Sequence, residues 1–268
     1  MSKAFRKIIP KNISVPILLS VPHCGIVFPE EIKDEFKPEL ISSPDDTDWF
    51  VDRLYSFATS MGITMVCSYY HRWVIDLNRD PNNQPLYADG RIITGLCPTT
   101  TFLGEHLYRD ERLEISAQEI ARRKELYFLP YHREIKHELS RLKQKFGKVL
   151  LWDAHSIRQE VKSIQTGKFP DLILGSFDEV SASPELIELV LNILSQSKYS
   201  VFHNNPFKGG YITRHYGNPA DDIHGLQLEM TKINYMDDLE ENWHEERAEK
   251  MQRVLKSVFQ KCIKKILV

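Results

Sequence analysis

The stretch K-V-L-L-W-D-A-H-S at Lys148–Ser156 carries much of the information on the fold. A short apolar, β-favouring run is followed at once by an aspartate and a histidine. A second stretch, P-I-L-L-S-V-P-H-C-G at Pro16–Gly25, repeats this order and places His23 directly after its own apolar run. Such runs predict buried strands, as found in parallel sheets. Because ligands gather at the carboxyl ends of these strands, we expect His23 and His155 to share a site.

Strand and helix patterns alternate along the chain and predict one α/β domain over residues 1–268, with a mixed, mainly parallel sheet flanked by helices. We expect strands at Pro16–Val21, Ile63–Tyr70, Arg72–Leu77, Lys148–Trp152, Asp171–Gly175, Tyr199–His203, Tyr211–Tyr216 and Leu226–Thr231. We expect helices from Asp46 to about Ser60, from a capping box at Ser116 to about Phe146, from Ser183, and from about Leu239. A long loop between Asp80 and Arg112 is typical of a functional segment.

The composition excludes several classes of protein. The chain has 268 residues, with 35 basic and 37 acidic side chains and a net charge of −2, and it lacks the basic block that nucleic-acid binding requires. Its four cysteines are scattered, which argues against a disulfide framework. Neither a signal peptide nor an apolar run long enough for a membrane span is visible. We therefore expect a cytoplasmic protein that binds neither nucleic acid nor membrane.

The histidines suggest a metal site. Residues two apart on a strand share a face, so Asp153 and His155 point the same way, and Asp153 is either a ligand or a group that orients one. Zinc accepts imidazole and carboxylate ligands, and catalytic zinc sites have three protein ligands. His23, His155 and either Asp46 or Asp48 satisfy that count, and the sequence leaves the choice between the two aspartates open.

A catalytic zinc site also needs a general base. The run G-L-Q-L-E-M at Gly225–Met230 supplies Glu229, which shares a strand face with Gln227. Glu229 is our candidate.

Arginines near these segments suit an acidic substrate. Arg72 and Arg79 stand at the two ends of R-W-V-I-D-L-N-R, and Arg214 lies in G-G-Y-I-T-R-H-Y-G. Guanidinium groups bind carboxylates through paired hydrogen bonds, so these residues are candidates for holding a small dianion. Tyr211 or Tyr216 is a candidate donor to a developing oxyanion.

The motifs S-x-P-H-x-G, D-T-D-W, R-x-x-I-D-L-N-R, D-x-H-S, G-G-Y-x-x-R-x-Y-G and Q-L-E-M follow one another between Ser20 and Tyr235. In this order the chain resembles the N-formylglutamate amidohydrolase family, which is related to the zinc carboxypeptidases and shares their α/β architecture. The resemblance implies one zinc ion bound by His23, His155 and an aspartate of Asp46–Asp48, with Glu229 as the catalytic glutamate. It implies that Asn78 and Arg79 grip a substrate carboxylate.

The resemblance also implies a reaction, the hydrolysis of N-formyl-L-glutamate to formate and L-glutamate in histidine degradation. Two alternatives remain open on the sequence. One is a zinc amidase or peptidase acting on another small N-acyl amino acid. The other is a non-catalytic protein that binds an acidic metabolite.

Overall fold

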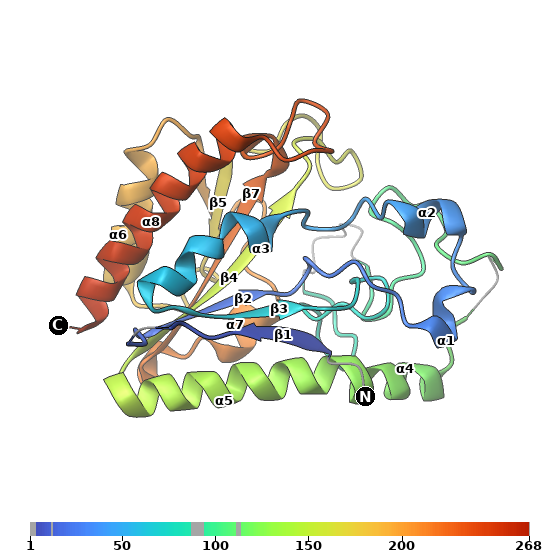
Figure 1. Cartoon of the computed structure of the whole chain (residues 1–268), viewed down its shortest axis with the longest axis horizontal. Helices are drawn as coiled ribbons and strands as arrows, with labels where there is room; N and C mark the ends of the chain where they lie inside the picture. Colours follow the sequence, from blue (N-terminus) through green and yellow to red (C-terminus); the bar gives the residue numbers. More distant parts are fainter. Residues whose placement is uncertain (1–3, 12, 87–93, 111–113, 268) are drawn as a thin grey trace.

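The computed structural model describes residues 4–11, 13–86, 94–110 and 114–267, and within these ranges seven strands form one mixed sheet (Figure 1). The strands are β1 (Phe5–Ile8), β2 (Ile17–Val21), β3 (Thr64–Ser68), β4 (Val149–Ile157), β5 (Leu172–Gly175), β6 (Val201–His203) and β7 (Ile223–Thr231). Their order is β1-β3-β2-β4-β7-β5-β6. The central strands β3, β2, β4 and β7 run parallel, β1 and β5 pair antiparallel with β3 and β7, and β6 is parallel to β5. The predicted single-domain α/β fold with a mixed, mainly parallel sheet is confirmed.

Helices cover both faces of this sheet (Figure 1). The helices are α1 (Glu30–Lys33), α2 (Pro38–Ser42), α3 (Val51–Leu54), α4 (Ala117–Arg123), α5 (Leu129–Phe146), α6 (Pro184–Ser195), α7 (Tyr211–Tyr216) and α8 (Glu245–Leu267). A π-helical turn, η2 (Lys124–Phe128), joins α4 to α5, and short 3₁₀ turns are η1 (Ser56–Met61), η3 (Pro219–Asp221) and η4 (Lys232–Asn234). Helices α3, α6 and α8 lie over one face, and α5 and α7 lie over the other.

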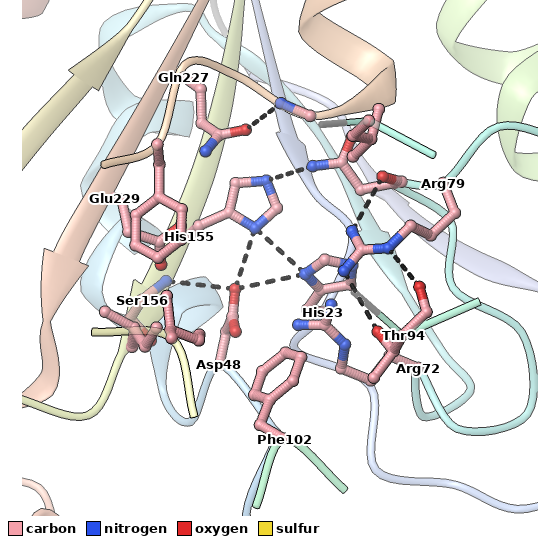
Figure 2. Close-up of a pocket in the computed structure, with 16 residues that line it drawn as sticks. His23, Asp48, Arg72, Arg79, Thr94, Phe102, His155, Ser156, Gln227 and Glu229 are labelled. Atoms are coloured by element: carbon pink, nitrogen blue, oxygen red, sulfur yellow. Dashed lines mark hydrogen bonds and ion pairs between the residues drawn. The ribbon is translucent and has the colours of Figure 1, made fainter. Parts of the chain in front are cut away.

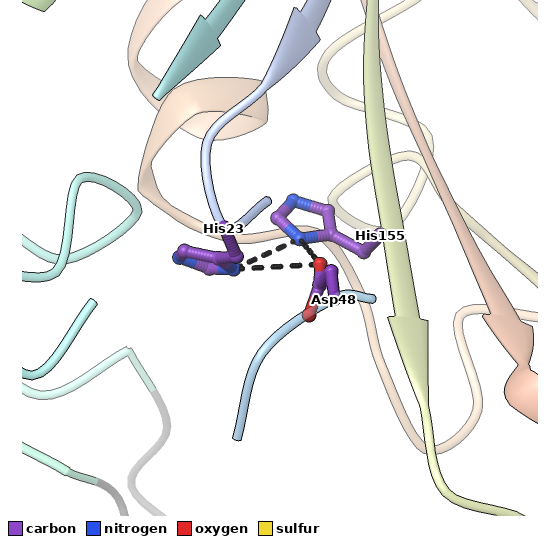
Figure 3. Close-up of side chains that lie close together, drawn as sticks. All are labelled: His23, Asp48 and His155. Atoms are coloured by element: carbon purple, nitrogen blue, oxygen red, sulfur yellow. Dashed lines mark hydrogen bonds and ion pairs between the residues drawn. The ribbon is translucent and has the colours of Figure 1, made fainter. Parts of the chain in front are cut away.

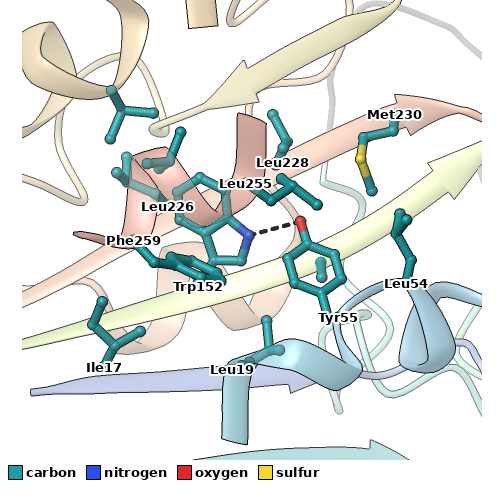
Figure 4. Packing of buried hydrophobic residues seen from close by; sticks show 14 of the residues in the cluster. Ile17, Leu19, Leu54, Tyr55, Trp152, Leu226, Leu228, Met230, Leu255 and Phe259 are labelled. Atoms are coloured by element: carbon teal, nitrogen blue, oxygen red, sulfur yellow. Dashed lines mark hydrogen bonds between the residues drawn. The ribbon is translucent and has the colours of Figure 1, made fainter. Parts of the chain in front are cut away.

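The alternation of side chains along the central strands divides the core into two layers. On β4, Leu150 and Trp152 pack with the layer under α3, α6 and α8, whereas Val149 and Leu151 pack with the layer that includes α5. The indole nitrogen of Trp152 donates to the hydroxyl of Tyr55 at 3.0 Å, inside the first layer (Figure 4). This bond satisfies the polar atom of a fully buried aromatic ring, as burial requires.

Polar residues replace apolar ones on the α5 side of the sheet near the strand ends. Asp153 and His155 continue the face that begins with Val149 and Leu151. In the parallel ladder between β4 and β7, Asp153 lies opposite Gln227 and His155 lies opposite Glu229. The register therefore brings two polar pairs to the carboxyl end of adjacent central strands.

The predicted strand at Tyr211–Tyr216 is wrong, because this segment is the helix α7. The backbone N–H of Arg214 donates to the carbonyl of Gly210, and that of Gly217 donates to Thr213. The ring of Tyr211 stacks on that of His215, with centroids 4.8 Å apart, a contact that the i, i+4 spacing of a helix permits. Aromatic and β-branched residues favour strands, but here tertiary packing outweighs that preference.

The predicted strand at Arg72–Leu77 is also wrong. This segment is a series of turns, in which the N–H of Val74 bonds the carbonyl of His71 and the N–H of Asp76 bonds the carbonyl of Leu96. Trp73 and its apolar neighbours are all buried, so the run reflects core packing rather than sheet pairing.

The predicted helix from Asp46 to about Ser60 is broken into α3 and the 3₁₀ turn η1, and Asp46 and Asp48 precede it in a turn. The predicted start of a helix at Ser116 is confirmed, since its hydroxyl accepts from the N–H of Glu119 at 3.1 Å. Residues 87–93 and 111–112 of the predicted long loop lie outside the described residues. The described part of that loop holds neither helix nor strand. No helix among the described residues combines the length and apolarity that crossing a membrane requires.

Candidate metal and substrate site

His23, Asp48 and His155 come from three separate segments and meet at one point (Figure 3). His23 follows β2, His155 lies on β4, and Asp48 lies in the turn before α3. The two Nδ1 atoms are 3.1 Å apart, and Oδ2 of Asp48 is 3.2 Å from Nδ1 of His155 and 3.7 Å from that of His23. The N–H of Asp48 donates to the carbonyl of His23 at 3.0 Å, which fixes the turn against the end of β2. All three side chains are buried.

Each histidine has its second ring nitrogen against a buried carboxylate. Nε2 of His23 is 2.8 Å from Oδ1 of Asp76, and Nε2 of His155 is 2.9 Å from Oδ2 of Asp153. An ionised carboxylate only accepts, so both Nε2 atoms carry the hydrogen and donate it. Both Nδ1 atoms then direct lone pairs to the common point, the arrangement that carboxylates impose on metal-binding histidines. Because two facing lone pairs repel, either a cation lies between the rings or one ring carries a second proton.

The three residues fit a divalent metal by donor type and by spacing. Two imidazole nitrogens and one carboxylate oxygen form a ligand set that zinc accepts readily. With metal–ligand bonds of about 2.0–2.1 Å, adjacent atoms of a tetrahedral site are about 3.3 Å apart. The observed separations of 3.1, 3.2 and 3.7 Å lie around that value. His23, Asp48 and His155 thus form a candidate metal site.

The carboxylates around the histidines favour positive charge at this point. Burial lowers the pKa of His155, but Asp153 and Asp48 outweigh it and raise that pKa well above its ordinary value. Burial also works against the ionisation of Asp48, yet His155 and His23 hold its pKa below the ordinary range. A metal ion would compete with the proton that these charges hold on His155.

Asp46, the other aspartate that the sequence offered as a ligand, has different partners. Its Oδ2 accepts from the indole N–H of Trp73 at 2.8 Å and from the backbone N–H of Phe102 at 3.1 Å. Burial raises the pKa of its carboxyl group. The structure therefore brings Asp48, and not Asp46, to the two histidines.

Glu229 lines the same cavity as the three candidate ligands (Figure 2). It is only 9% exposed, and within the described part of the chain its carboxyl group has no hydrogen-bond partner. Burial raises its pKa to about 8, an effect that His155 opposes and Asp48 reinforces. A carboxyl group that titrates near neutral pH beside a candidate metal site is suited to general acid–base chemistry.

Both polar and apolar side chains line the cavity. Its volume is about 730 Å³, including its mouth, which is open to solvent. Its polar lining includes the candidate ligands, Glu229 and two arginines. Its apolar lining consists of Leu86, Phe102, Ile157, Ile164 and Phe207. The cavity thus suits a small ligand with both charged groups and methylenes.

Arg72 and Arg79 are connected to the candidate metal site through Asp76. Nη2 of Arg72 donates to Oδ2 of Asp76 at 2.6 Å, and Nη1 of Arg79 lies 3.7 Å from the same oxygen. Burial works against the charge of Asp76, but the two guanidinium groups hold its pKa well below the ordinary range. The guanidinium of Arg72 also stacks on Phe102, 4.7 Å from the ring centroid. Asp76 therefore holds His23 and positions both cationic groups at the cavity wall.

Asn78 lines the cavity, but its amide group is engaged with the protein. Nδ2 lies 3.2 Å from Oδ2 of Asp153, and Oδ1 accepts from the N–H of Ile212 at 2.7 Å. A side chain at Gly210 would displace the amide of Asn78, since an added Cβ would lie 2.3 Å from its Nδ2. Asn78 thus links the start of α7 to Asp153 on β4.

Arg214 and Tyr211 are not among the described residues that line this cavity. Nε of Arg214 donates to the carbonyl of Gly209 at 2.7 Å, and Nη1 donates to that of Leu86 at 2.6 Å. Its guanidinium lies over the ring of Phe177. These contacts give Arg214 a role in holding Leu86, which belongs to the cavity wall.

Two residues of the site were not singled out from the sequence. Asp76 lies in R-W-V-I-D-L-N-R, and the only sequence signal for its role is an acidic residue between two apolar ones. Its side chain is completely buried. Gln227 shares a strand face with Glu229, but its role depends on a contact with Gly210 that local pattern does not reveal.

Comparison with known proteins identifies the family. A family model described as N-formylglutamate amidohydrolase matches residues 15–236. An N-formylglutamate deformylase of Pseudomonas putida is 43% identical over 248 residues, which cover 92% of this chain and 91% of the relative. A protein of the same name from Pseudomonas aeruginosa is 42% identical over 229 residues, 85% of each chain.

Solved structures agree with this result. The crystal structure of an N-formylglutamate amidohydrolase from Ralstonia eutropha JMP134 matches with a TM-score of 0.82 and 25% identity, over 99% of both chains. A protein of Agrobacterium tumefaciens shares the fold, with a TM-score of 0.72 and 16% identity over 97% of this chain and 96% of that one. The chain belongs to the N-formylglutamate amidohydrolase family.

Proposed function

We propose that this protein is a zinc-dependent deformylase that hydrolyses N-formyl-L-glutamate to formate and L-glutamate. The observation that carries the proposal is the cluster of His23, Asp48 and His155. The Nε2–H of each histidine donates to a buried carboxylate, and Glu229 lines the same cavity. The names of the two Pseudomonas relatives supply the substrate. When bound, zinc supplies Lewis-acid chemistry, polarising a carbonyl oxygen and acidifying water.

Glu229 serves as the general base and then as the general acid. Its carboxylate accepts a proton from the water that attacks the formyl carbon, and it returns that proton to the departing amide nitrogen. The two products are then formate and the free amine of glutamate. Burial and Asp48 raise the pKa of Glu229, whereas a cation bound beside it would lower that pKa and make the carboxylate available to accept the proton.

The arginines bind the carboxylates of the substrate. Arg72 and Arg79 line the cavity and remain charged, and Asp76 neutralises them only in part because its single negative charge faces two guanidinium groups. N-formylglutamate carries two carboxylates, whereas its formyl group offers one weak acceptor. Recognition therefore rests on the amino-acid half of the molecule.

Metal analysis and formate release test this function together. We expect about one zinc ion per chain and formate release from N-formyl-L-glutamate. Glu229→Gln should retain the metal and lose at least ~10²-fold in turnover, since general acid–base catalysis contributes about 10²–10⁴-fold. His23→Ala and His155→Ala should lose both metal and turnover. Near-normal turnover of Glu229→Gln would remove it from the mechanism, and full metal occupancy of either alanine variant at limiting zinc would exclude that histidine as a ligand.

A further inference from the structure

Gln227 presents an unused hydrogen-bond donor to the active-site cavity. Gln227 is only 4% exposed, and it lines the cavity between β7 and α7. Its Oε1 accepts from the backbone N–H of Gly210 at 2.7 Å (Figure 2). A backbone N–H can only donate, so the carboxamide has one orientation and Nε2 is on the side away from Gly210. Within the described residues Nε2 has no hydrogen-bond partner.

The position of Gln227 along β7 places this donor deeper than the reacting groups. Gln227 precedes Glu229 by two residues on the same face, a rise of roughly 6.7 Å along a strand. In extended N-formylglutamate the side-chain carboxyl carbon is about 6 Å from the formyl carbon, and the α-carboxyl carbon is about 4 Å away. With the formyl group beside Glu229, the side-chain carboxylate is the group that spans the distance to Gln227.

The chemistry at this depth favours an acceptor on the ligand. The Asp153 carboxylate opposite Gln227 is fully buried and accepts from Ser20, Asn78 and His155, so its oxygens are already engaged by donors of the protein. The amide hydrogens of Gln227 can bind an oxygen, but they repel an ammonium group. We propose that Nε2 of Gln227 donates to the side-chain carboxylate of the substrate amino acid and thereby selects an acidic residue. This assignment rests on the proposed deformylase function, which it deepens.

Two substitutions separate this role from the support of Gly210. Gln227→Glu keeps an oxygen for the Gly210 N–H but replaces the donor with a second acceptor. Gln227→Met removes both. Gln252→Met serves as the matched control, because it also deletes a glutamine hydrogen bond, from Nε2 to the carbonyl of Leu54, away from the cavity.

The readouts are kcat/KM for N-formyl-L-glutamate and N-formyl-L-norleucine, and calorimetric binding of L-glutamate and L-norleucine to the zinc-loaded protein. Both Gln227 variants should lose about 10–100-fold in kcat/KM and in affinity for the glutamate ligands, the value of a buried hydrogen bond to a charged group. The norleucine ligands should change by less than about threefold, and the Gln252→Met variant should match wild type with all four.

Three results have distinct meanings. If Gln227→Glu matches wild type while Gln227→Met fails, Gln227 only holds Gly210 and the inference is overturned. Equal losses for glutamate and norleucine ligands also overturn it, because the side chain is then not the group that is read. If wild type binds L-glutamate through Gln227 but releases no formate from N-formyl-L-glutamate, the proposed function fails and the inference stands.

Discussion

Replacing Asp153 with asparagine should weaken zinc binding by about 10–100-fold without unfolding the protein. Asp153 accepts from Nε2 of His155 at 2.9 Å, from Ser20 at 2.8 Å and from Asn78 at 3.2 Å. Asparagine preserves the shape and one oxygen for His155, but the charge is lost. Loss of an outer carboxylate typically reduces metal affinity 10–100-fold, which corresponds to about 1.4–2.7 kcal/mol.

The measurement is a zinc dissociation constant from competition with a chromogenic chelator, at several pH values from about 6.5 to 8.5. Asp153 and Asp48 raise the pKa of His155 above its ordinary value despite burial, so zinc must displace a proton from His155. Wild-type affinity should therefore strengthen as the pH rises toward that pKa. Without Asp153 the proton is held less tightly, and the affinity should depend less on pH. The loss of affinity should be greatest at the alkaline end, where the proton competes least.

Asp46→Asn is the matched control. Asp46 is also a buried aspartate that accepts hydrogen bonds, but its partners are Trp73 and Phe102 rather than a histidine. The zinc dissociation constant of the Asp46→Asn variant should stay within about twofold of the wild-type value. An unchanged constant for Asp153→Asn, or an equal loss for Asp46→Asn, would refute the assignment of the histidine partners.

Arg79→Ala should lower kcat/KM for N-formyl-L-glutamate at least about tenfold, because a desolvated charge partner of the substrate is removed; steady-state kinetics that match wild type would exclude it from binding. Burial lowers the pKa of His132 from 6.5 to about 4, so the folded state binds a proton less readily than the unfolded state. The free energy of unfolding should therefore fall by roughly 3 kcal/mol in total as the pH drops from about 6.5 to 4. Urea unfolding at both pH values should show a smaller loss for His132→Gln, and an unchanged slope would assign the effect elsewhere. Phe259→Ala should cost about 3–5 kcal/mol of unfolding free energy, because Phe259 is fully buried against Trp152, and a loss below about 1 kcal/mol in urea unfolding would contradict that packing.

The sequence by itself determined the class of fold and most of the candidate chemistry. The apolar runs that became β2 and β4 are local patterns, and burial on both faces leaves the parallel sheet as their natural setting. His23 comes just after the first run and His155 lies near the end of the second strand. Because the two strands are parallel, both histidines lie at the same edge of the sheet. Alternation placed Gln227 and Glu229 on one face of their strand, but it did not decide whether that face meets the cavity or solvent.

Tertiary structure alone decided which groups complete the site. The contact of His23 with Asp76 spans 53 positions and that of His155 with Asp48 spans 107, and no local pattern encodes pairings at such separations. Asp46 and Asp48 have the same chemistry and nearly the same position in the chain, and the turn that binds the carbonyl of His23 selects Asp48. Tyr211–Tyr216 has the composition of a strand but forms α7, because the Gly210 and Asn78 contacts begin a helix there. Local propensities amount to a few tenths of a kcal/mol per residue, and buried hydrogen bonds and packing between distant segments exceed them.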